Sequence, residues 1–459
     1  MDLAIRNGTV VTAEATFAAD IGIERGKIAQ VGGSVAKATR ELDAKGLFVM
    51  PGAVDVHTHL DMPFMGTATA DDHRTGTQAA AAGGVTTLID FAMQPKGASL
   101  LETLDIWKKK AAGKAAIDYS FHVAVTQWDD SVPDQVQRLA DDGIPSLKVF
   151  MAYKHQLQIE DEVFLRILKA ARRVGSRVMV HAENGDAAYI LQQEAIAAGK
   201  REPKFHSESR PRIIEGEAVA RAIVLAELAD APLFVVHNSC QEAIYHIGVA
   251  RRRGLRIFGE TCPQYLGAIT VDDLYRPGFE GAKYVCTPPL RDSEQARAMW
   301  SALAADMLQW ISSDHCPFRM DQRRMGQDDF TLIPNGVPGV ETLVPLVWTM
   351  GVGSGRISPN RFVDLISTAP ARVFGLAPRK GTLSPGADGD VMLFDPAREV
   401  TLAAKDLHQN LDYTPYEGFK VRGYPVTTIS RGEVVWEKNV LSATAGRGQL
   451  IPRAPLAGL

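Results

Sequence analysis

Eight apolar segments of strand length recur along the middle of the chain. Most are nearly continuous apolar runs, which is typical of parallel strands covered on both faces. Between most of them lie patterns with a helical period. Residues 159–175 form one such pattern, with acidic residues in the first turn, basic residues in the last and Gly175 as the predicted stop. The segments are residues 53–59, 86–91, 119–125, 146–152, 177–183, 233–239, 255–261 and 307–314.

The alternation of strands and helices predicts an α/β fold. Eight strand–helix units fit a closed (β/α)₈ barrel of the TIM type. An open doubly wound sheet is the alternative, but no Gly-x-Gly-x-x-Gly sequence follows the first strand. We therefore predict a (β/α)₈ TIM-like barrel over residues 53–379.

Both ends of the chain show short strands joined by tight turns. Asn7-Gly8 is a hairpin signal, and a second hairpin is predicted around Arg25-Gly26. Residues 388–396 and 426–437 repeat the pattern near the other end. Two unrelated hairpins are the alternative, but each end alone offers few strands to bury a face.

We therefore predict that residues 1–52 and 380–440 build one small β-sandwich domain. Residues 441–459 are rich in glycine and proline, and we predict a tail that wraps a neighbour or is loose.

Composition excludes several classes of protein. Hydrophobic residues make up 46% and charged residues 23%, enough for a large core. With 50 basic and 54 acidic side chains the formal charge is −4, which argues against a nucleic-acid partner. The sequence contains no run of about 18 apolar residues, so no membrane span is predicted. No signal peptide is visible, and the four cysteines form no Cys-x-x-Cys pair, so a reducing cytoplasm is expected.

Several apolar strands end in residues that bind metals. His57 and His59 end the first strand two positions apart, so their rings face the same side. Two satisfied polar residues would explain that pair alone. His181 ends the fifth strand, His237 the sixth and Asp314 the eighth. Because parallel barrel strands open at one rim, these side chains are predicted to converge on a metal site.

Lys148 lies inside the fourth apolar strand. Burial favours the neutral amine of a lysine. The common alternatives are a buried carboxylate partner or a side chain that reaches solvent. A neutral amine beside a metal can take up carbon dioxide, and the resulting carbamate can bridge two cations about 3.5–4 Å apart.

The order His-x-His, Lys, His, His, Asp resembles the amidohydrolase superfamily. More closely, the chain is similar to the dihydropyrimidinase/hydantoinase family, in its D-hydantoinase-like form, over essentially its whole length. The matching segments are GAVDVHTHLDMPFMG, SLKVFMAYK, VMVHAEN, FVVHNSC, ETCPQYL, KYVCTPPLRD, SSDHCPF and IPNGVPGVE.

The resemblance implies a binuclear metal enzyme and a homo-oligomer, usually a tetramer. Imidazole and carboxylate ligands suit Zn²⁺ first, although Mn²⁺, Co²⁺ and Fe²⁺ accept the same donors. The implied ligands are His57, His59, His181, His237, Asp314 and Lys148 as N6-carboxylysine.

The implied reaction is hydrolytic ring opening of 5-substituted hydantoins or dihydropyrimidines to N-carbamoyl amino acids. Two cations make hydroxide available from a bridging water at about pH 7. Asp314 is expected to move the proton to the leaving nitrogen. By resemblance, Tyr153 is the oxyanion donor, and Thr287 and Asn335 contact the polar ring edge. A packed aromatic residue and ordinary loop polar residues are the alternatives. Many relatives have Ser where this chain has Thr287.

Other functions remain open on the same scaffold. A dihydroorotase needs a cation for the substrate carboxylate, usually an Arg just after the His-x-His pair, and residues 60–65 contain none. Allantoinase is a second alternative. A non-catalytic scaffold protein is a third, but this chain keeps every type of ligand.

Some side chains are predicted to support structure only. His73, His206 and His246 are expected at the surface or against helices, and His122 in a core hydrogen bond. Residues 62–65 and 150–151 are apolar and would suit a hydrophobic substituent on the ring, or they anchor loops.

Overall fold

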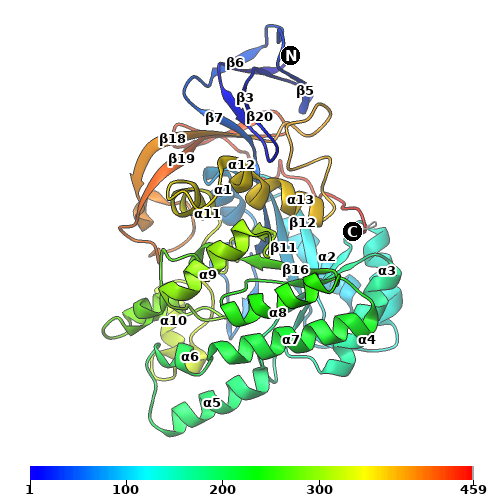
Figure 1. Ribbon diagram of the computed structural model, residues 1–459, viewed down its shortest axis with the longest axis vertical. Helices are drawn as coiled ribbons and strands as arrows, with labels where there is room; N and C mark the ends of the chain where they lie inside the picture. The colour runs from blue at the N-terminus through cyan, green and yellow to red at the C-terminus, as the bar shows by residue number, and fades with distance from the viewer. Residues whose placement is uncertain (457–459) are drawn as a thin grey trace.

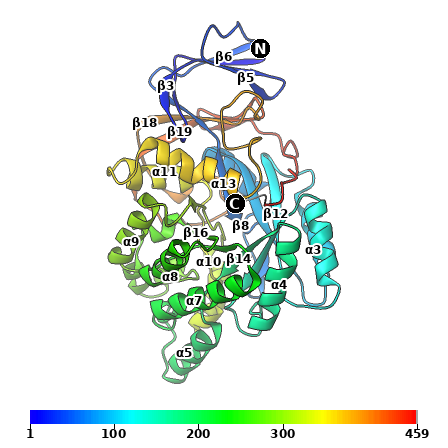
Figure 2. The same ribbon diagram turned by 45° about the vertical axis from the view of Figure 1, so that its right-hand side comes forward.

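Eight parallel strands form the centre of the molecule. The computed structural model describes residues 1–456 (Figures 1 and 2). Consecutive strands are neighbours throughout the sheet, and Thr58 forms a parallel bridge to His315 between its edges. The predicted barrel and all eight of its strands are therefore confirmed. The strands are β8 (Ala53–Thr58), β11 (Val85–Met93), β12 (Asp118–Ala124), β13 (Ser146–Phe150), β14 (Arg177–His181), β15 (Leu233–Val235), β16 (Ile257–Thr261) and β17 (Trp310–Ile311).

Helices cover the outside of the barrel (Figure 1). The predicted helix at residues 159–175 is α4 (Asp161–Arg173), which ends just before Gly175 at a φ of 65°. Two π-helical stretches, η6 (Trp348–Val352) and η7 (Asp364–Thr368), interrupt the last helical region. The other α-helices are α1 (Thr75–Ala82), α2 (Leu100–Ala111), α3 (Val132–Asp141), α5 (Gly185–Ala197), α6 (Phe205–Glu208), α7 (Arg212–Ala229), α8 (Gln241–Arg252), α9 (Ser293–Ala304), α10 (Met320–Arg323), α11 (Leu343–Val347), α12 (Pro359–Val363) and α13 (Ala369–Val373).

Strands from both ends of the chain form two further sheets above the barrel (Figure 1). Apolar side chains of the two sheets share one core, as the predicted sandwich requires. The two ends meet where β18 pairs with β7. The domain limits at residues 52 and 380 stay a prediction. One sheet contains β5 (Lys27–Val31), β4 (Ile21–Glu24), β1 (Leu3–Arg6) and β6 (Arg40–Asp43). The other contains β21 (Val440–Leu441), β20 (Glu433–Glu437), β19 (Lys420–Ser430), β18 (Val391–Thr401), β7 (Phe48–Pro51), β2 (Thr9–Val11) and β3 (Thr16–Ala18).

The turn at Asn7-Gly8 does not form the predicted hairpin. It carries the chain from β1 in one sheet to β2 in the other. Asn7 has a φ of 61°, and a Cβ on Gly8 would lie 2.4 Å from Val49 Cγ2. The turn signal is therefore real, but it marks a corner between packed sheets. The hairpins at Arg25-Gly26 and Arg431-Gly432 form as predicted.

Of the two alternatives for the tail, a loose segment is contradicted for the residues that the structure describes. Residues 442–456 run along the end of the barrel where the strands begin. The Ile451 backbone N–H donates to Tyr119 O at 2.7 Å, beside the first residues of β12. Arg453 is buried there, with Nε 2.9 Å from Ser120 Oγ and another nitrogen 2.6 Å from Ser146 Oγ. The segment thus covers this end of the barrel in its own chain. Residues 457–459 lie outside the described part.

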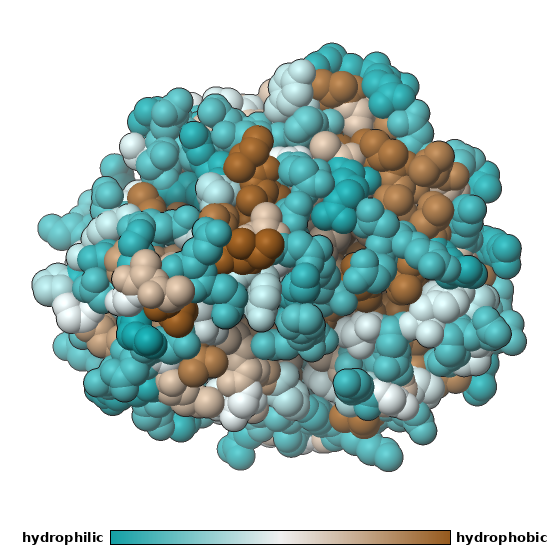
Figure 3. Space-filling view, turned by 90° about the horizontal axis from the view of Figure 1, so that it is seen from below, coloured by the Kyte–Doolittle hydropathy of each residue, from teal (hydrophilic) through white to brown (hydrophobic). Residues whose placement is uncertain are grey.

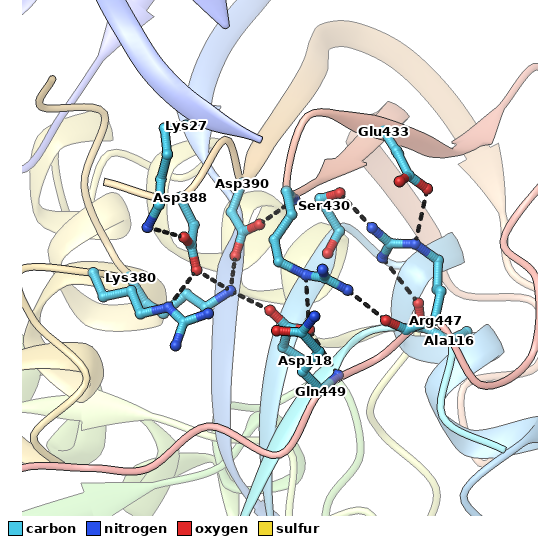
Figure 4. Close-up of polar contacts among 12 residues, drawn as sticks. Lys27, Ala116, Asp118, Lys380, Asp388, Asp390, Ser430, Glu433, Arg447 and Gln449 are labelled. Carbon is cyan, nitrogen blue, oxygen red and sulfur yellow. Dashed lines mark hydrogen bonds and ion pairs between the residues drawn. The ribbon is translucent and has the colours of Figure 1, made fainter. Parts of the chain in front are cut away.

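A buried charge cluster joins the small sheets, the barrel and the C-terminal segment (Figure 4). Lys380 Nζ lies 2.7 Å from carboxylate oxygens of Asp118 and Asp390, and 3.0 Å from one of Asp388. Asp118 begins β12 and also accepts a 2.9 Å hydrogen bond from the backbone of Gln449. Each carboxylate therefore has a cation or an N–H group as its partner.

The molecular surface on the side of α5 is hydrophilic over most of its area, with apolar patches between (Figure 3). Among residues 1–456, no helix has both the length and the apolar character that a membrane crossing requires.

Candidate metal centre and active site

All the side chains predicted for the site line one cavity at the rim where the barrel strands end. Its lining includes His57, His59, Lys148, Tyr153, His181, His237, Thr287, Asp314 and Asn335.

The ends of the strands place these side chains. His57 and His181 belong to β8 and β14, and Lys148 lies within β13. His237 and Asp314 lie beyond the observed ends of β15 and β17, so the predicted strands 233–239 and 307–314 were too long. Both have positive φ values, 40° and 50°. Such a backbone is costly for a side-chain-bearing residue and is typical of functional sites.

His57, His59 and Asp314 form a compact group of possible metal ligands. Asp314 Oδ1 lies 3.2 Å from His57 Nε2 and 3.4 Å from His59 Nε2. One donor atom from each of the three residues lies within 4.8 Å of the others. The ring centroids of His181 and His237 lie 4.5 Å apart, and the His57 centroid lies 5.4 Å from that of His237 and 5.3 Å from that of His59. The four imidazoles and one carboxylate therefore line the same cavity.

The histidine nitrogens fit a metal. His57 Nε2, His59 Nδ1 and His237 Nδ1 are buried and have no hydrogen-bond partner in residues 1–456. Burial lowers the pKa of all three imidazoles and neighbouring positive groups lower it further, which together outweigh the opposing effect of Asp314 on His57 and His59. They are therefore neutral, which is the form that binds metals. Unpaired buried nitrogens are costly unless a ligand satisfies them.

Lys148 is fully buried and forms no salt bridge within residues 1–456. Burial lowers the pKa of its amine to about 8, although Asp314 and Glu260 oppose the shift. Its Nζ lies 5.0 Å from the centre of the Phe91 ring. Lys148 therefore lacks the carboxylate partner that commonly accompanies a buried lysine, whereas Lys380 has three such partners. An amine of this kind can form a carbamate, as the resemblance requires.

Tyr153 offers a protonated hydroxyl to the cavity. Burial raises the pKa of its phenol, and hydrogen bonds with Thr287 and Asn335 oppose that shift. The backbone of Tyr153 has a φ of 66°, the third positive value among the site residues. The arrangement places a hydrogen-bond donor beside two further polar side chains, where the carbonyl and the ring edge of a cyclic amide could bind.

Part of the cavity lining is apolar and includes Met62, Phe64, Met93, Phe150 and Leu157. Residues of both predicted apolar segments therefore face the site, although Phe150 is the last residue of strand β13 and not part of a loop.

Sequence reasoning missed three side chains that contact site residues. Glu260 Oε2 lies 2.9 Å from His57 Nδ1, and Glu183 Oε2 lies 2.7 Å from His181 Nε2. Each glutamate lies at or near the end of a barrel strand, which was a usable signal. His206, predicted at the surface or against a helix, is buried with Nε2 3.2 Å from Thr287 Oγ1.

Two other histidine predictions have different outcomes. His73 is fully buried, which no periodicity in its short segment indicated. His122 forms the predicted core hydrogen bonds, to Ser146 Oγ at 2.6 Å and Val56 O at 3.0 Å.

Comparison with known proteins finds relatives that match nearly the whole chain. A family model described as "Amidohydrolase family" matches residues 48–435. The chain is 46% identical to a D-hydantoinase of Rhizobium radiobacter, over 99% of both chains. It is 40% identical to a dihydropyrimidinase of Rattus norvegicus, over 99% of this chain and 89% of the relative. A crystal structure of dihydropyrimidinase from Brevibacillus agri superposes with a TM-score of 0.99 at 45% identity, covering both chains completely.

Proposed function

The chain belongs to the amidohydrolase family and is a cyclic amidohydrolase that opens its substrate ring by hydrolysis, and from this premise we propose which side chains perform the reaction. The family depends on metal ions. The similarity to hydantoinases and dihydropyrimidinases extends over the full length, so neither an allantoinase, a dihydroorotase nor a scaffold protein is favoured.

The proposed metal site holds two divalent cations, with Zn²⁺ as the first candidate. The unpaired imidazole nitrogens and the unpaired Lys148 amine support it. Mn²⁺, Co²⁺ and Fe²⁺ would accept the same donors. The proposed ligands are His57, His59, His181, His237, Asp314 and Lys148 as N6-carboxylysine.

Divalent cations held by the proposed ligands would make hydroxide available from water at about neutral pH and would polarise the amide carbonyl. The protein's own side chains would guide the reaction in three ways. Asp314 takes the proton of the attacking water and delivers it to the ring nitrogen as the C–N bond breaks. Tyr153 donates a hydrogen bond to the carbonyl oxygen as negative charge develops. Thr287 and Asn335 hold the polar edge of the ring. The product is an N-carbamoyl amino acid.

The apolar side chains in the cavity lining support a substrate that carries a hydrophobic substituent. Met62, Phe64 and Phe150 would contact such a group beside the ring. We therefore propose 5-substituted hydantoins as the preferred substrates over unsubstituted dihydropyrimidines.

We also propose a homotetramer, as the family resemblance implies. Apolar side chains exposed on α7 and α8 support contact with a second copy of the chain: Ile213, Val224, Leu228 and Tyr245. The cytoplasmic location stays a prediction.

The Lys148→Ala variant tests the proposed bridging group. Removing the amine removes the carbamate, so we expect loss of turnover on a 5-substituted hydantoin and a lower metal content by elemental analysis. Short carboxylic acids added with Zn²⁺ are expected to restore part of the turnover, because they can replace the carbamate oxygens.

Lys169→Ala is the matched control, since Lys169 is exposed on α4. It should keep the turnover and the metal content of the parent. Parent-like turnover in Lys148→Ala would show that no bridging carbamate is needed.

A further inference from the structure

A pair of buried charged side chains lies directly behind His181. Glu183 Oε2 is 2.7 Å from His181 Nε2, and an Arg210 guanidinium nitrogen is 3.1 Å from the same oxygen. Glu183 is fully buried and Arg210 is 4% exposed.

Arg210 also contacts the proposed oxyanion donor. The centre of its guanidinium lies 5.8 Å from the centroid of the Tyr153 ring, within reach of a cation–π contact. One arginine thus touches the partner of a proposed metal ligand and the ring of a proposed catalytic residue.

A second buried arginine fixes the backbone of the first. Arg291 donates to Arg210 O at 2.7 Å, to Glu215 Oε2 at 3.0 Å and to Ser239 Oγ at 3.0 Å. Ser239 follows His237 by two residues, and Arg291 follows Thr287 by four. The network therefore connects the loops that carry the site residues of several strands.

The hydrogen bond to Glu183 determines which nitrogen of His181 faces the metals. A carboxylate acceptor at Nε2 requires the proton there, so Nδ1 is left with its lone pair. His57 shows the opposite arrangement, because Glu260 lies 2.9 Å from its Nδ1 and leaves Nε2 free. The site thus needs two different imidazole tautomers, and each has its own buried glutamate.

A purely structural ion pair would not have to fix the tautomer of a neighbouring histidine. Such a pair needs only its own two partners, whereas Glu183 accepts from Arg210 and His181 through a single oxygen, and Glu183 Oε1 has no partner in residues 1–456. The shared oxygen makes the position of the carboxylate depend on Arg210.

We propose that Arg210 is a positioning residue: it holds Glu183 so that His181 presents Nδ1 to a metal ion, and it supports the ring of Tyr153. This inference rests on the function proposed above. Neither Arg210 nor Glu183 is assigned a contact with the substrate.

Zn²⁺ affinity is the first measurement, made by chelator competition on the purified full chain. We expect Arg210→Met and Glu183→Gln to bind Zn²⁺ about 10–100-fold more weakly, the range usual for lost partners of metal ligands. Arg210→Lys should recover part of the loss because it keeps a charge near Glu183. The double variant should be little worse than Arg210→Met alone, because both changes disrupt the same contact.

Two reference variants separate positioning from a general loss of structure. Arg212→Met removes a neighbouring arginine whose only ion pair among residues 1–456 is a partly exposed one with Glu242, and it should behave like the parent. Tyr153→Phe should lower kcat but keep the Zn²⁺ affinity of the parent. The absorption spectrum of the Co²⁺-loaded protein should change in Arg210→Met and not in Arg212→Met.

The inference is wrong if Arg210→Met and Glu183→Gln bind Zn²⁺ as tightly as the parent and give its Co²⁺ spectrum. If Arg210→Met does not fold, Glu183→Gln and Arg210→Lys still decide the question, with thermal unfolding of the metal-free proteins as the check. A parent protein that binds no Zn²⁺ would instead contradict the proposed function itself.

Discussion

At the scale of single residues, Asp314 has two proposed tasks, as a metal ligand and as the group that carries the proton. Burial raises the pKa of its carboxyl, but nearby His57 and His59 lower it below the usual value, so the carboxylate is ionised and can accept a proton. Asparagine has nearly the same shape but cannot take up that proton. We expect Asp314→Asn to lower kcat by at least about 10²–10⁴-fold, the usual contribution of a positioned acid–base group, with the fold intact by circular dichroism.

Asp321→Asn is a suitable control for this change, since the Asp321 side chain is exposed and its only ion pair within the described residues is with Arg319. Unchanged turnover in Asp314→Asn would remove this residue from the mechanism.

The residues of the site differ in how far the sequence could predict them. His57, His181 and Asp314 follow apolar runs, so strand periodicity and the shared barrel rim were enough to bring them together. Asn335 lies in a loop without regular periodicity, and only the family resemblance indicated it. Arg210 precedes a helix by two residues, and nothing local shows that its guanidinium turns inward, because that depends on a partner far away in the chain.

At the scale of elements, α7 and α8 expose large apolar side chains to solvent, which is unfavourable unless another surface covers them. Ile213 and Leu228 on α7 are 67% and 66% exposed. If this face contacts a second copy, two glutamates there would place charges in the interface. We expect the variant with Ile213→Glu and Leu228→Glu to form smaller oligomers than the parent in light scattering, where a parent tetramer has four times the chain mass of 49.8 kDa.

Val440→Glu is the control, because it adds a charge of the same sign at an exposed apolar position on β21. An unchanged mass in the double variant would show that α7 and α8 are not in the interface.

The existence of an element was predicted well where a run of apolar residues determines it, but the residue at which an element ends was predicted poorly. All eight barrel strands were found because each is apolar over several residues. The strands at 233–239 and 307–314 end earlier than predicted, since left-handed residues such as His237 and Asp314 turn the chain, and apolar patterns do not reveal backbone dihedral angles. Asn7-Gly8 was assigned to a hairpin because a turn signal does not say which sheet the next strand joins.

At the scale of the whole molecule, the cluster around Lys380 connects parts of the chain that are remote in sequence (Figure 4). Lys380 is 2% exposed, and its three aspartates depend on its charge. Replacing it with methionine would leave buried carboxylates without their main cation. We expect Lys380→Met to lower the free energy of unfolding by about 3–5 kcal/mol at pH 7, the range for breaking a buried ion pair.

The loss should shrink in acid. In the parent, the pKa of Asp388 is about 2 because Lys380 and other cations outweigh the effect of burial, against an ordinary value of 3.8. This carboxylate therefore stabilises the fold above pH 3.8, and the contribution disappears as the pH falls toward 2. Denaturant unfolding at pH 7 and at about pH 2 measures the change. Lys405→Met, at an exposed position, is the control, and an equal loss at both pH values would contradict the argument.

The C-terminal segment covers one end of the barrel and leaves the other end open. Arg453 and its neighbours cover the end where the strands begin, and the Leu456 backbone N–H donates to Gly175 O there, at 2.7 Å. The cavity opens at the other end. Substrate and product must therefore use the same entrance. A solid support or fusion partner attached at the C-terminus would hold the catalyst by its closed end, with the entrance directed toward the solution.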